Sequence, residues 1–453
     1  MAKDRERMSA RAGVILAAGQ GTRMKSAKPK VMHAVAGQPI LGHVIAAMRG
    51  AAVSRIVVVT APDAGDVRAY VAKQGAESVI QVRQLGTGHA AACAGALLEE
   101  FAGPVVVSYG DHPLFTSATF DASFAAGEKT GMAIVAFRSQ SNAYGRVIVD
   151  RDGLLDRIVE YRDASEAERK VELCNAGIMT ADAKNFFGWA ANLKTENTQG
   201  EYYLTDIPSF AKADHVRCAV VEADEAETMG VNSRAELARA EAAMQRRLRE
   251  KMLDSGVGMM APDTVYFSFD TFIEPDAQID AFVVFSPGVT VKRGAHIRAF
   301  SHLEGAEVGA GAIVGPYARL RPGARIEEDV HIGNFVEVKN ARVEKGAKAN
   351  HLTYLGDARV GAGANIGAGT ITCNYDGFDK HFTDIGAGAF IGSNSALVAP
   401  VAVKDGAYVA AGSVITKDVE ADSLAVTRAP QNDVPGWAEK FRTRKKLEKS
   451  KNT

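Results

Sequence analysis

The residues best suited to chemistry lie in one glycine-rich segment near the N-terminus, residues 13–30, which read GVILAAGQGTRMKSAKPK. Its apolar run, 14–17, is typical of a buried strand. Glycines directly after a strand let backbone N–H groups close around a phosphate chain, because no Cβ atom stands in the way. Arg23 and Lys30 add positive charge beside that loop. The spacing matches neither the Walker-A lysine pattern nor the dinucleotide pattern GxGxxG, so we expect a phosphate-binding loop of another class.

Two further candidates lie outside this segment. Asp111 follows the apolar run 105–109 after a single glycine, and a carboxylate there suits Mg²⁺, which prefers oxygen ligands and bridges phosphates. The residues alone leave open that Asp111 only forms a turn. His351 could remove a proton from an amine, because imidazole titrates near neutral pH. From the residues alone, a solvent-facing corner residue is the favoured explanation for His351.

Two architectures must position these residues, and the first is an α/β domain. Residues 13–230 alternate strand-like runs, at 14–17, 56–60, 105–109 and 132–136, with helical patterns at 40–48 and 87–98. This alternation predicts a Rossmann-like domain with a parallel sheet that helices cover on both faces. Ligands bind at the carboxyl ends of the strands in such sheets, so the glycine loop and Asp111 should meet at one edge.

The second architecture is a repeat of six residues that starts near residue 273. Apolar residues recur at this spacing from Ile279 to Ile415, with Gly and Ala crowded between them. A short fixed repeat indicates stacked units, and six residues per side predict a left-handed parallel β-helix with one inward apolar residue per side. Residues 373–384, CNYDGFDKHFTD, break the period and should form a loop on this scaffold.

A charged helix is expected to connect the two architectures over residues 233–253. Ser233 and Glu236 form a capping-box pattern at its start, and Gly256 would follow its end. We therefore expect an α/β domain at 1–232, a connecting helix at 233–255, and a β-helix domain at 256–453 that ends in a basic tail.

Composition excludes several classes of protein. The chain of 453 residues should form two or three domains, and its net charge of −1 gives no basic surface for nucleic acid. No apolar run reaches the roughly 18 residues of a membrane helix, and the charged N-terminus lacks the apolar region of a signal peptide. The four cysteines form no CxxC pair, which predicts neither disulfides nor a zinc site and suits the cytoplasm.

The glycine-rich segment resembles the signature of sugar-1-phosphate nucleotidyltransferases, L-x-x-G-x-G-T-x-M followed by Pro-Lys. Two C-terminal segments, HLTYLGDARVG (351–361) and NIGAGTITCNYDG (365–377), narrow the resemblance to the bacterial bifunctional N-acetylglucosamine-1-phosphate uridylyltransferase/glucosamine-1-phosphate N-acetyltransferases. The resemblance covers about residues 13–437. It implies that the β-helix acetylates glucosamine-1-phosphate with acetyl-CoA, and that the α/β domain then joins the product to UMP from UTP. The UDP-N-acetylglucosamine so made would feed peptidoglycan and lipopolysaccharide synthesis.

The resemblance implies a role for each residue of the uridylyltransferase site. One or two Mg²⁺ ions would be held by Asp111 and Asn232, while Arg23 and Lys30 would act on the phosphates. The N-acetylglucosamine would contact Gly145, Glu160, Asn175 and Asn232. UTP and its uracil would contact Leu16, Ala17, Ala18, Gly19, Gly21, Thr22, Lys30, Gln81, Gly86, Thr87, Tyr109, Gly110 and Asp111.

The resemblance also implies an acetyltransferase site with His351 as general base. Glucosamine-1-phosphate would contact Arg321, Lys339, Tyr354, Asn365, Asn374 and Tyr375, and acetyl-CoA would contact Ala368, Ser393, Ala411 and Arg428. Such β-helices generally assemble as homotrimers with acyl-donor clefts between neighbouring chains. Covalent catalysis through Cys373 is disfavoured, because an amine attacks a thioester without an enzyme nucleophile.

The sequence departs from this family at His112, in Gly-Asp-His-Pro, and at Asn142-Ala143, where Thr-Gly usually precedes Tyr-Gly-Arg. Two alternatives remain. A single-function nucleotidyltransferase could use its β-helix for assembly or regulation, but this leaves His351, Arg321 and Lys339 unexplained. A non-catalytic scaffold would be expected to lose the glycine loop and Asp111.

Overall fold

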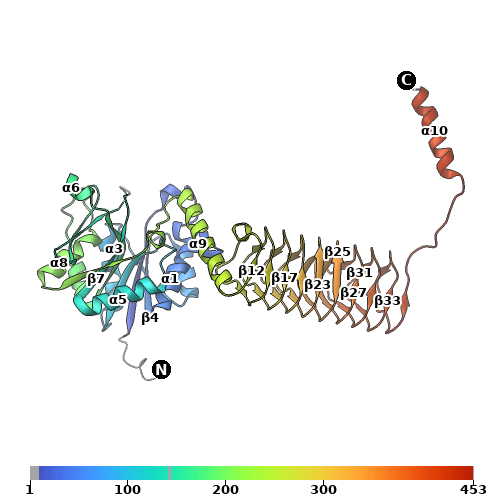
Figure 1. Cartoon of the computed structure of the whole chain (residues 1–453), viewed down its shortest axis with the longest axis horizontal. Helices are drawn as coiled ribbons and strands as arrows, with labels where there is room; N and C mark the ends of the chain where they lie inside the picture. The colour runs from blue at the N-terminus through green and yellow to red at the C-terminus, as the bar shows by residue number, and fades with distance from the viewer. Residues whose placement is uncertain (1–9, 141–143, 452–453) are drawn as a thin grey trace. The chain divides into compact units, whose positions relative to one another are not determined.

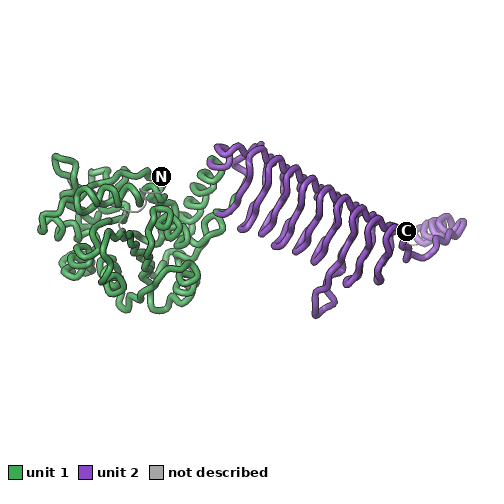
Figure 2. The backbone as a smooth tube through the Cα atoms, turned by 90° about the horizontal axis from the view of Figure 1, so that it is seen from below, with its two compact units in different colours: residues 1–250, 267–269 green, residues 251–266, 270–453 purple. Residues whose placement is uncertain are grey.

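The computed structural model describes residues 10–140 and 144–451. The chain forms two compact units, residues 1–250 with 267–269 and residues 251–266 with 270–453 (Figures 1 and 2). The extreme N-terminal residues, the departure at Asn142-Ala143 and the last two residues of the basic tail lie outside the described residues. Within the described ranges, no helix has both the length and the apolar character needed to cross a membrane.

Unit 1 is built on a twisted sheet whose strands follow the order β11-β7-β10-β6-β1-β4-β5. Strand β1 pairs in parallel with β4 and β6, as expected for a Rossmann-like core. The bounds are β1 (Arg11–Ala17), β4 (Val53–Thr60), β5 (Glu77–Ile80), β6 (Pro104–Tyr109), β7 (Gly131–Arg138), β10 (Leu173–Asp182) and β11 (Arg217–Glu222). A short pair, β2 (Ala34–Val35) and β3 (Gln38–Pro39), lies apart from this sheet.

One strand differs from the expected parallel arrangement. Strand β10 runs antiparallel to both of its neighbours, β6 and β7. Parallel neighbours need a crossover connection, usually a helix, whereas the chain after β7 forms the hairpin β8 (Arg146–Val149) and β9 (Leu155–Val159). The apolar pattern of β10 is the same for either direction, so the sequence could not distinguish them.

Helices cover both faces of the sheet, as predicted (Figure 1). Strand β1 shows the reason, because Val14 and Leu16 belong to one apolar core while Ile15 and Ala17 belong to the other. One core includes α1 (Ile40–Gly50), α2 (Gly65–Lys73) and α5 (Ser117–Thr130); the other includes α3 (Thr87–Cys93), α4 (Gly95–Leu98), α7 (Ala183–Ala190) and α8 (Ile207–Ala213). The short α6 (Glu166–Arg169) buries no residue. The sequence predicts one helix at 87–98, but the structure has two helices there, α3 and α4, which meet at Ala94.

Side chains along helix α9 (Arg234–Asp254) form hydrogen bonds with other parts of unit 1. Glu241 accepts the Ala36 N–H at 2.7 Å, and Arg247 donates to the Leu114 carbonyl at 2.9 Å. The buried Gln245 side chain bonds both backbone groups of Phe267, at 2.7 and 2.8 Å. These contacts explain why unit 1 extends to Glu250.

Unit 2 is a left-handed β-helix whose coils are stacked in a row (Figure 2). Its short strands pair in parallel with strands of the next coil. In the two-residue strands that start at Gln278–Ile279, the second residue generally points inward and is buried, which is the origin of the six-residue period. One face consists of β12 (Gly258–Met259), β14 (Gln278–Ile279), β17 (His296–Ile297), β20 (Ile313–Val314), β23 (His331–Asn334), β25 (Lys348–His351), β27 (Asn365–Ile366), β30 (Phe390–Ile391), β33 (Tyr408–Val409) and β35 (Leu424–Ala425).

The other two faces share the long strands β24 (Glu337–Val343) and β26 (Tyr354–Val360). One contains β13 (Phe272–Ile273), β16 (Thr290–Val291), β19 (Glu307–Val308), β22 (Arg325–Ile326), β29 (Thr383–Ile385) and β32 (Val401–Val403). The other contains β15 (Val284–Phe285), β18 (His302–Leu303), β21 (Arg319–Leu320), β28 (Ile371–Cys373), β31 (Ala396–Val398) and β34 (Val414–Ile415). The segment that breaks the period leaves the coil between β28 and β29, and a final helix, α10 (Trp437–Lys451), follows the coils.

One edge of the β-helix carries large apolar residues in an unusual backbone conformation. We call it the aromatic edge; it comprises Phe282, Phe300, Tyr317, Phe335, Leu352, Gly369, Asn394 and Gly412, all with positive φ. Backbone hydrogen bonds link successive members or their neighbours from coil to coil. The four rings stack with centroids 4.9–5.3 Å apart.

Candidate active sites

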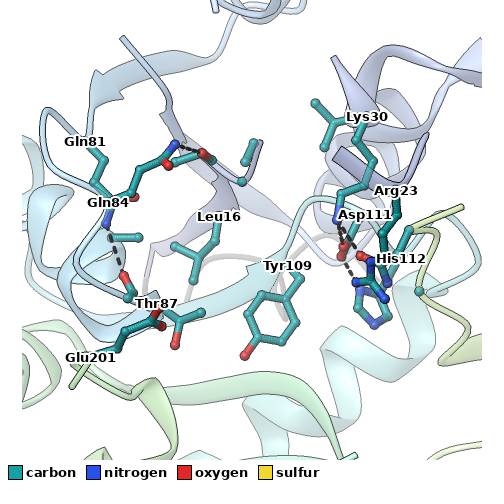
Figure 3. A pocket seen from close by; sticks show the side chains of 18 of the residues that line it. Leu16, Arg23, Lys30, Gln81, Gln84, Thr87, Tyr109, Asp111, His112 and Glu201 are labelled. Atoms are coloured by element: carbon teal, nitrogen blue, oxygen red, sulfur yellow. Dashed lines mark hydrogen bonds and ion pairs between the residues drawn. The ribbon is translucent and has the colours of Figure 1, made fainter. Parts of the chain in front are cut away.

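A cavity of about 520 Å³ opens in unit 1 beside the carboxyl ends of β1 and β6 (Figure 3). It brings together most of the residues expected to bind nucleotide, sugar or metal: Leu16, Ala17, Ala18, Gly19, Arg23, Lys30, Gln81, Gly86, Thr87, Tyr109, Asp111, Asn175 and Asn232. Thr22 lines an adjacent cavity of about 710 Å³. Gly21, Gly110, Gly145 and Glu160 do not line the first cavity.

Three expected site residues converge on one point of the cavity wall. The Lys30 ammonium donates to Oδ2 of Asp111 and, at 2.8 Å, to Oδ1 of Asn232. The Val231 N–H donates to the Asp111 carbonyl at 2.9 Å, and Glu236 in the first turn of α9 accepts the Asn232 N–H at 2.7 Å. A carboxylate oxygen and an amide oxygen thus face a single positive charge, so this donor set fits a Mg²⁺ ion.

The ionised form of Asp111 is strongly favoured despite the burial of its carboxyl group. Burial by itself raises the pKa of the carboxyl group, but His112 and Lys30 outweigh it and hold the pKa well below its usual range. Asp111 is therefore an anion at neutral pH, as a metal ligand must be. His112, which the sequence showed only as a departure, contacts Oδ1 of Asp111 at 2.7 Å.

The wall opposite this cluster carries amide groups (Figure 3). The buried Gln81 side chain donates to the Gly86 carbonyl at 3.1 Å and lies 3.0 Å from Nδ1 of His89, so it fixes the turn that starts α3. Gln84, the first residue of the Gln84–Gly88 turn that the sequence predicts to contact the uracil, donates to the Ala18 carbonyl of the glycine loop at 2.5 Å. This wall offers the donors and acceptors that a uracil ring needs.

The three remaining sugar-binding candidates are neighbours. The Asn175 N–H donates to the Gly145 carbonyl at 2.9 Å. A Cβ atom at Gly145 would lie 3.5 Å from both Glu160 carboxylate oxygens, an ordinary van der Waals distance, so the two residues are close neighbours. Burial raises the pKa of the Glu160 carboxyl group, and the negative charges of Asp163 and Asp206 raise it further. A hydrogen bond from Thr205 acts in the opposite direction.

In unit 2, His351 and the expected acetyl-CoA residues follow one edge. His351, Ala368, Ser393 and Ala411 each directly precede a member of the aromatic edge, at Leu352, Gly369, Asn394 and Gly412. The Arg428 guanidinium donates to the Ala411 carbonyl at 2.7 Å, which adds it to this column.

A partner for His351 comes from the coil before it. Asn334 pairs with His351 across β23 and β25, and its Oδ1 lies 2.7 Å from Nδ1 of the imidazole. Because an amide oxygen only accepts, Nδ1 carries the hydrogen and Nε2 is left for proton transfer. The sequence analysis missed Asn334, although the coil length could have identified it.

The cations expected to hold the sugar phosphate gather with one more that the sequence analysis missed. Arg321, Lys339 and Gly356 occupy corresponding positions on successive coils. Lys380, from the segment that breaks the period, lowers the pKa of Lys339 by direct contact and like-charge repulsion, and Arg321 adds to that repulsion. An anion bound here would relieve the repulsion.

The same segment contributes the remaining amino-sugar candidates. The buried Asn374 side chain donates to Asp357 at 2.5 Å, and the Tyr375 hydroxyl donates to the Gly377 carbonyl at 2.6 Å. Tyr354 lies on the face between the His351 column and the Lys339 group, paired with Glu337. Asn365 begins β27 and pairs with Lys348.

Comparison with known proteins identifies both halves of the chain. The MobA-like NTP transferase domain family matches residues 13–175, and the bacterial transferase hexapeptide family matches residues 305–340. The bifunctional protein GlmU of Paramagnetospirillum magneticum is 53% identical over 97% of this chain and 98% of its own length. GlmU of Rhodospirillum rubrum is 53% identical over 98% and 100%, and GlmU of Caulobacter vibrioides 52% over 97% and 96%.

The chain belongs to the GlmU family. The relatives match this chain from end to end, and a nucleotidyltransferase and a hexapeptide transferase family each match part of it. The chain is accordingly a bifunctional enzyme of UDP-N-acetylglucosamine synthesis, with a uridylyltransferase and a glucosamine-1-phosphate N-acetyltransferase activity. The match through both halves disfavours the single-function and scaffold alternatives.

Proposed function

We propose that uridylyl transfer takes place in the unit 1 cavity, with Mg²⁺ held by Asp111 and Asn232. The observation that carries this assignment is the convergence of those two oxygens on the Lys30 ammonium. When bound, the ion neutralises phosphate charge as the anionic reactants approach. Bound phosphates would in turn draw the Lys30 ammonium toward the reacting centre, since they carry more negative charge than the amide of Asn232.

The reaction joins a phosphate oxygen of N-acetylglucosamine-1-phosphate to the α-phosphorus of UTP and breaks the bond to pyrophosphate. Arg23 and the glycine-loop N–H groups stabilise the charge of the leaving pyrophosphate. Gln81 and the Gly86-Thr87 turn hold the uracil, and Gly145, Glu160 and Asn175 orient the sugar. These residues align the reactants and stabilise charge, and the mechanism includes no covalent intermediate with the enzyme.

Acetyl transfer is proposed to take place on unit 2. The amine of glucosamine-1-phosphate attacks the acetyl-CoA thioester, Nε2 of His351 removes a proton from the amine, and CoA leaves as the thiol. The hydrogen bond from Nδ1 to Asn334 supports this role, because it fixes the tautomer of the base. Arg321, Lys339 and Lys380 hold the phosphate, while Tyr354, Asn365, Asn374 and Tyr375 line the sugar. Acetyl-CoA lies along Ala368, Ser393 and Ala411 and meets Arg428.

The assembly is proposed to be a cytoplasmic homotrimer in which the β-helices pack side by side. The aromatic edge supports burial against a second copy, because its rings are 48–55% exposed in the single chain. Each ring residue also has φ of 56–61°, a left-handed conformation that costs roughly 1–2 kcal/mol for a non-glycine residue. Backbone hydrogen bonds between coils hold this conformation, and contact with a second copy would bury the exposed rings.

One assay tests the assigned function. The full chain is incubated with glucosamine-1-phosphate, acetyl-CoA, UTP and Mg²⁺, and free thiol and pyrophosphate are measured. Both products should appear, and pyrophosphate should depend on prior acetylation and on the metal. Thiol without pyrophosphate, or pyrophosphate without thiol, would contradict the two-site assignment.

Separated units should keep one activity each. A fragment of residues 1–250 should be monomeric and make UDP-N-acetylglucosamine only from pre-acetylated sugar phosphate, because the nucleotide site lies wholly in unit 1. A fragment starting at Lys251 should be trimeric and only acetylate. Light scattering and the two assays decide the outcome. A monomeric β-helix fragment that still acetylates would show that one chain contains a complete acetyl site.

The aromatic edge should be necessary for trimers. The double change Phe300→Glu and Phe335→Glu places charges where rings stack, and burying unpaired charges is costly. We therefore expect monomers in light scattering and a loss of most acetylation, because the proposed acyl-donor clefts lie between chains. Tyr408→Glu is the matched control, because Tyr408 stacks on Phe390 on a face away from this edge. Dissociation of the control but not of the double variant would assign the contact to the other face.

A further inference from the structure

His112 has a contact that the activity assigned above leaves unexplained. Its Nδ1 lies 2.7 Å from Oδ1 of Asp111, the neighbouring residue in the chain. Since an ionised carboxylate only accepts hydrogen bonds, Nδ1 must carry the hydrogen and donate it. Asp111 therefore has its two oxygens bound differently: Oδ1 by His112, and Oδ2 by Lys30.

The imidazole ring is held from several sides. Tyr109 stacks on it at a centroid distance of 5.7 Å and Phe115 at 5.2 Å, with interplanar angles of 27° and 10°. A Cβ atom at Gly230 would lie 3.0 Å from Nε2, so glycine allows the backbone of that segment to approach the ring. With 11% of its side chain exposed, His112 has little freedom to turn away from Asp111.

The imidazole ring of His112 has a contact on the side of each proposed metal ligand, Asp111 and Asn232. Gly230 begins the Gly-Val-Asn segment that ends in Asn232, and the Val231 N–H bonds the Asp111 carbonyl. The ring thus contacts the segment that bears one ligand and hydrogen-bonds the side chain of the other. Of the two Asp111 oxygens, Oδ2 shares the Lys30 ammonium with Asn232.

We infer that His112 is a positioning residue for the Mg²⁺ site: its hydrogen bond holds Oδ1 of Asp111 so that Oδ2 is presented, together with Asn232, to the metal. This inference rests on the proposed metal ligands of unit 1. Outer partners of metal-binding carboxylates fix the direction of the ligand, and their loss costs about 10–100-fold in metal affinity. The alternative is that His112 only fills space between Tyr109 and Phe115.

Two substitutions separate the hydrogen bond from the packing. In His112→Asn the amide nitrogen takes the place of Nδ1 on the same Cγ atom, which keeps the donor and removes the ring. In His112→Phe the ring remains between Tyr109 and Phe115, but the donor is lost. His112→Leu, a second variant without a donor, replaces His112→Phe if the latter has a lowered unfolding midpoint.

Binding of Mn²⁺ to the full chain is measured by electron paramagnetic resonance of the free ion, with UDP-N-acetylglucosamine present and no pyrophosphate, so that no turnover occurs. Asp111→Asn defines the signal that does not belong to this site. We expect the wild type and His112→Asn to agree within about threefold, and His112→Phe to bind about 10–100-fold more weakly. The Mg²⁺ concentration for half-maximal uridylyl transfer should rise by the same factor, with kcat at saturating Mg²⁺ little changed.

Two results would overturn the inference. If His112→Phe binds Mn²⁺ as tightly as the wild type, the hydrogen bond is not needed and His112 only fills space. If His112→Asn loses as much affinity as His112→Phe, a hydrogen-bond donor at this position does not preserve the site, and the inference fails as well. A different failure is distinguishable from these. If Asp111→Asn itself binds Mn²⁺ like the wild type, the proposed metal ligands are wrong, and the inference falls with them.

Discussion

Replacing Asp111 with alanine should stop Mg²⁺-dependent release of pyrophosphate and leave CoA release nearly intact. Metal stabilisation of a transferring phosphoryl group contributes several kcal/mol, so losing about 4 kcal/mol would slow uridylyl transfer roughly 10³-fold. The same change leaves the Lys30 ammonium, whose side chain is 13% exposed, without its carboxylate partner. Both effects act on unit 1, whereas the acetyl residues all belong to unit 2.

The measurement is a pair of assays on one protein sample, pyrophosphate release from UTP and thiol release from acetyl-CoA. Asp111→Asn is the matched control for side-chain volume and should also lose uridylyl transfer, because the amide lacks the charge. Thermal unfolding establishes that each variant is folded. Equal loss of both activities in a folded trimer would contradict two independent sites, since distant residues should act additively.

Replacing His351 with alanine should lower acetyl transfer by about 10²–10⁴-fold, the usual contribution of a general base. The folding cost should be small, because the His351 side chain lies at an exposed edge and its partner Asn334 can bond water instead. Uridylyl transfer to pre-acetylated sugar phosphate should persist. Thiol release under saturating acetyl-CoA measures the loss.

Asn334→Ala provides a graded comparison with His351→Ala. It keeps the imidazole but removes the acceptor that fixes its tautomer, so a smaller loss of kcat with little change in KM is expected. If His351→Ala retains the full rate, His351 is structural and another residue must act as the base.

Much of the fold follows from local patterns. The helix α9 expected at 233–253 occupies Arg234–Asp254, and the strand expected at 14–17 is the end of β1. The six-residue period corresponds directly to the buried second residues of the β-helix strands, from Ile279 to Ile415. Patterns of this kind are readable because each inward position is set by the few residues around it.

The sequence pattern did not predict the direction of β10 or the split between α3 and α4. A buried strand has the same apolar composition in either direction, and the hairpin β8–β9 that turns the chain back is decided by pairing with β10. The break at Ala94 lies directly before Gly95, and glycine is about 1 kcal/mol less favourable than alanine inside a helix. The alanines around it continue the helical pattern, so the pattern alone did not show where the helix divides.

The amino-acid sequence showed which chemical groups the protein has: the glycine loop, Arg23 and Lys30, Asp111, and a period of six with His351 on it. Which of these groups meet depends on how the helices, strands and coils pack. Lys30 bridges Asp111 and Asn232, which lie 81 and 202 residues away in the chain. His112 meets the backbone at Gly230, and Lys380 contacts Lys339 from a segment outside the period. The reason is physical: spacing along the chain fixes neighbours within a helix, strand or coil, whereas contacts between distant segments depend on how whole elements pack.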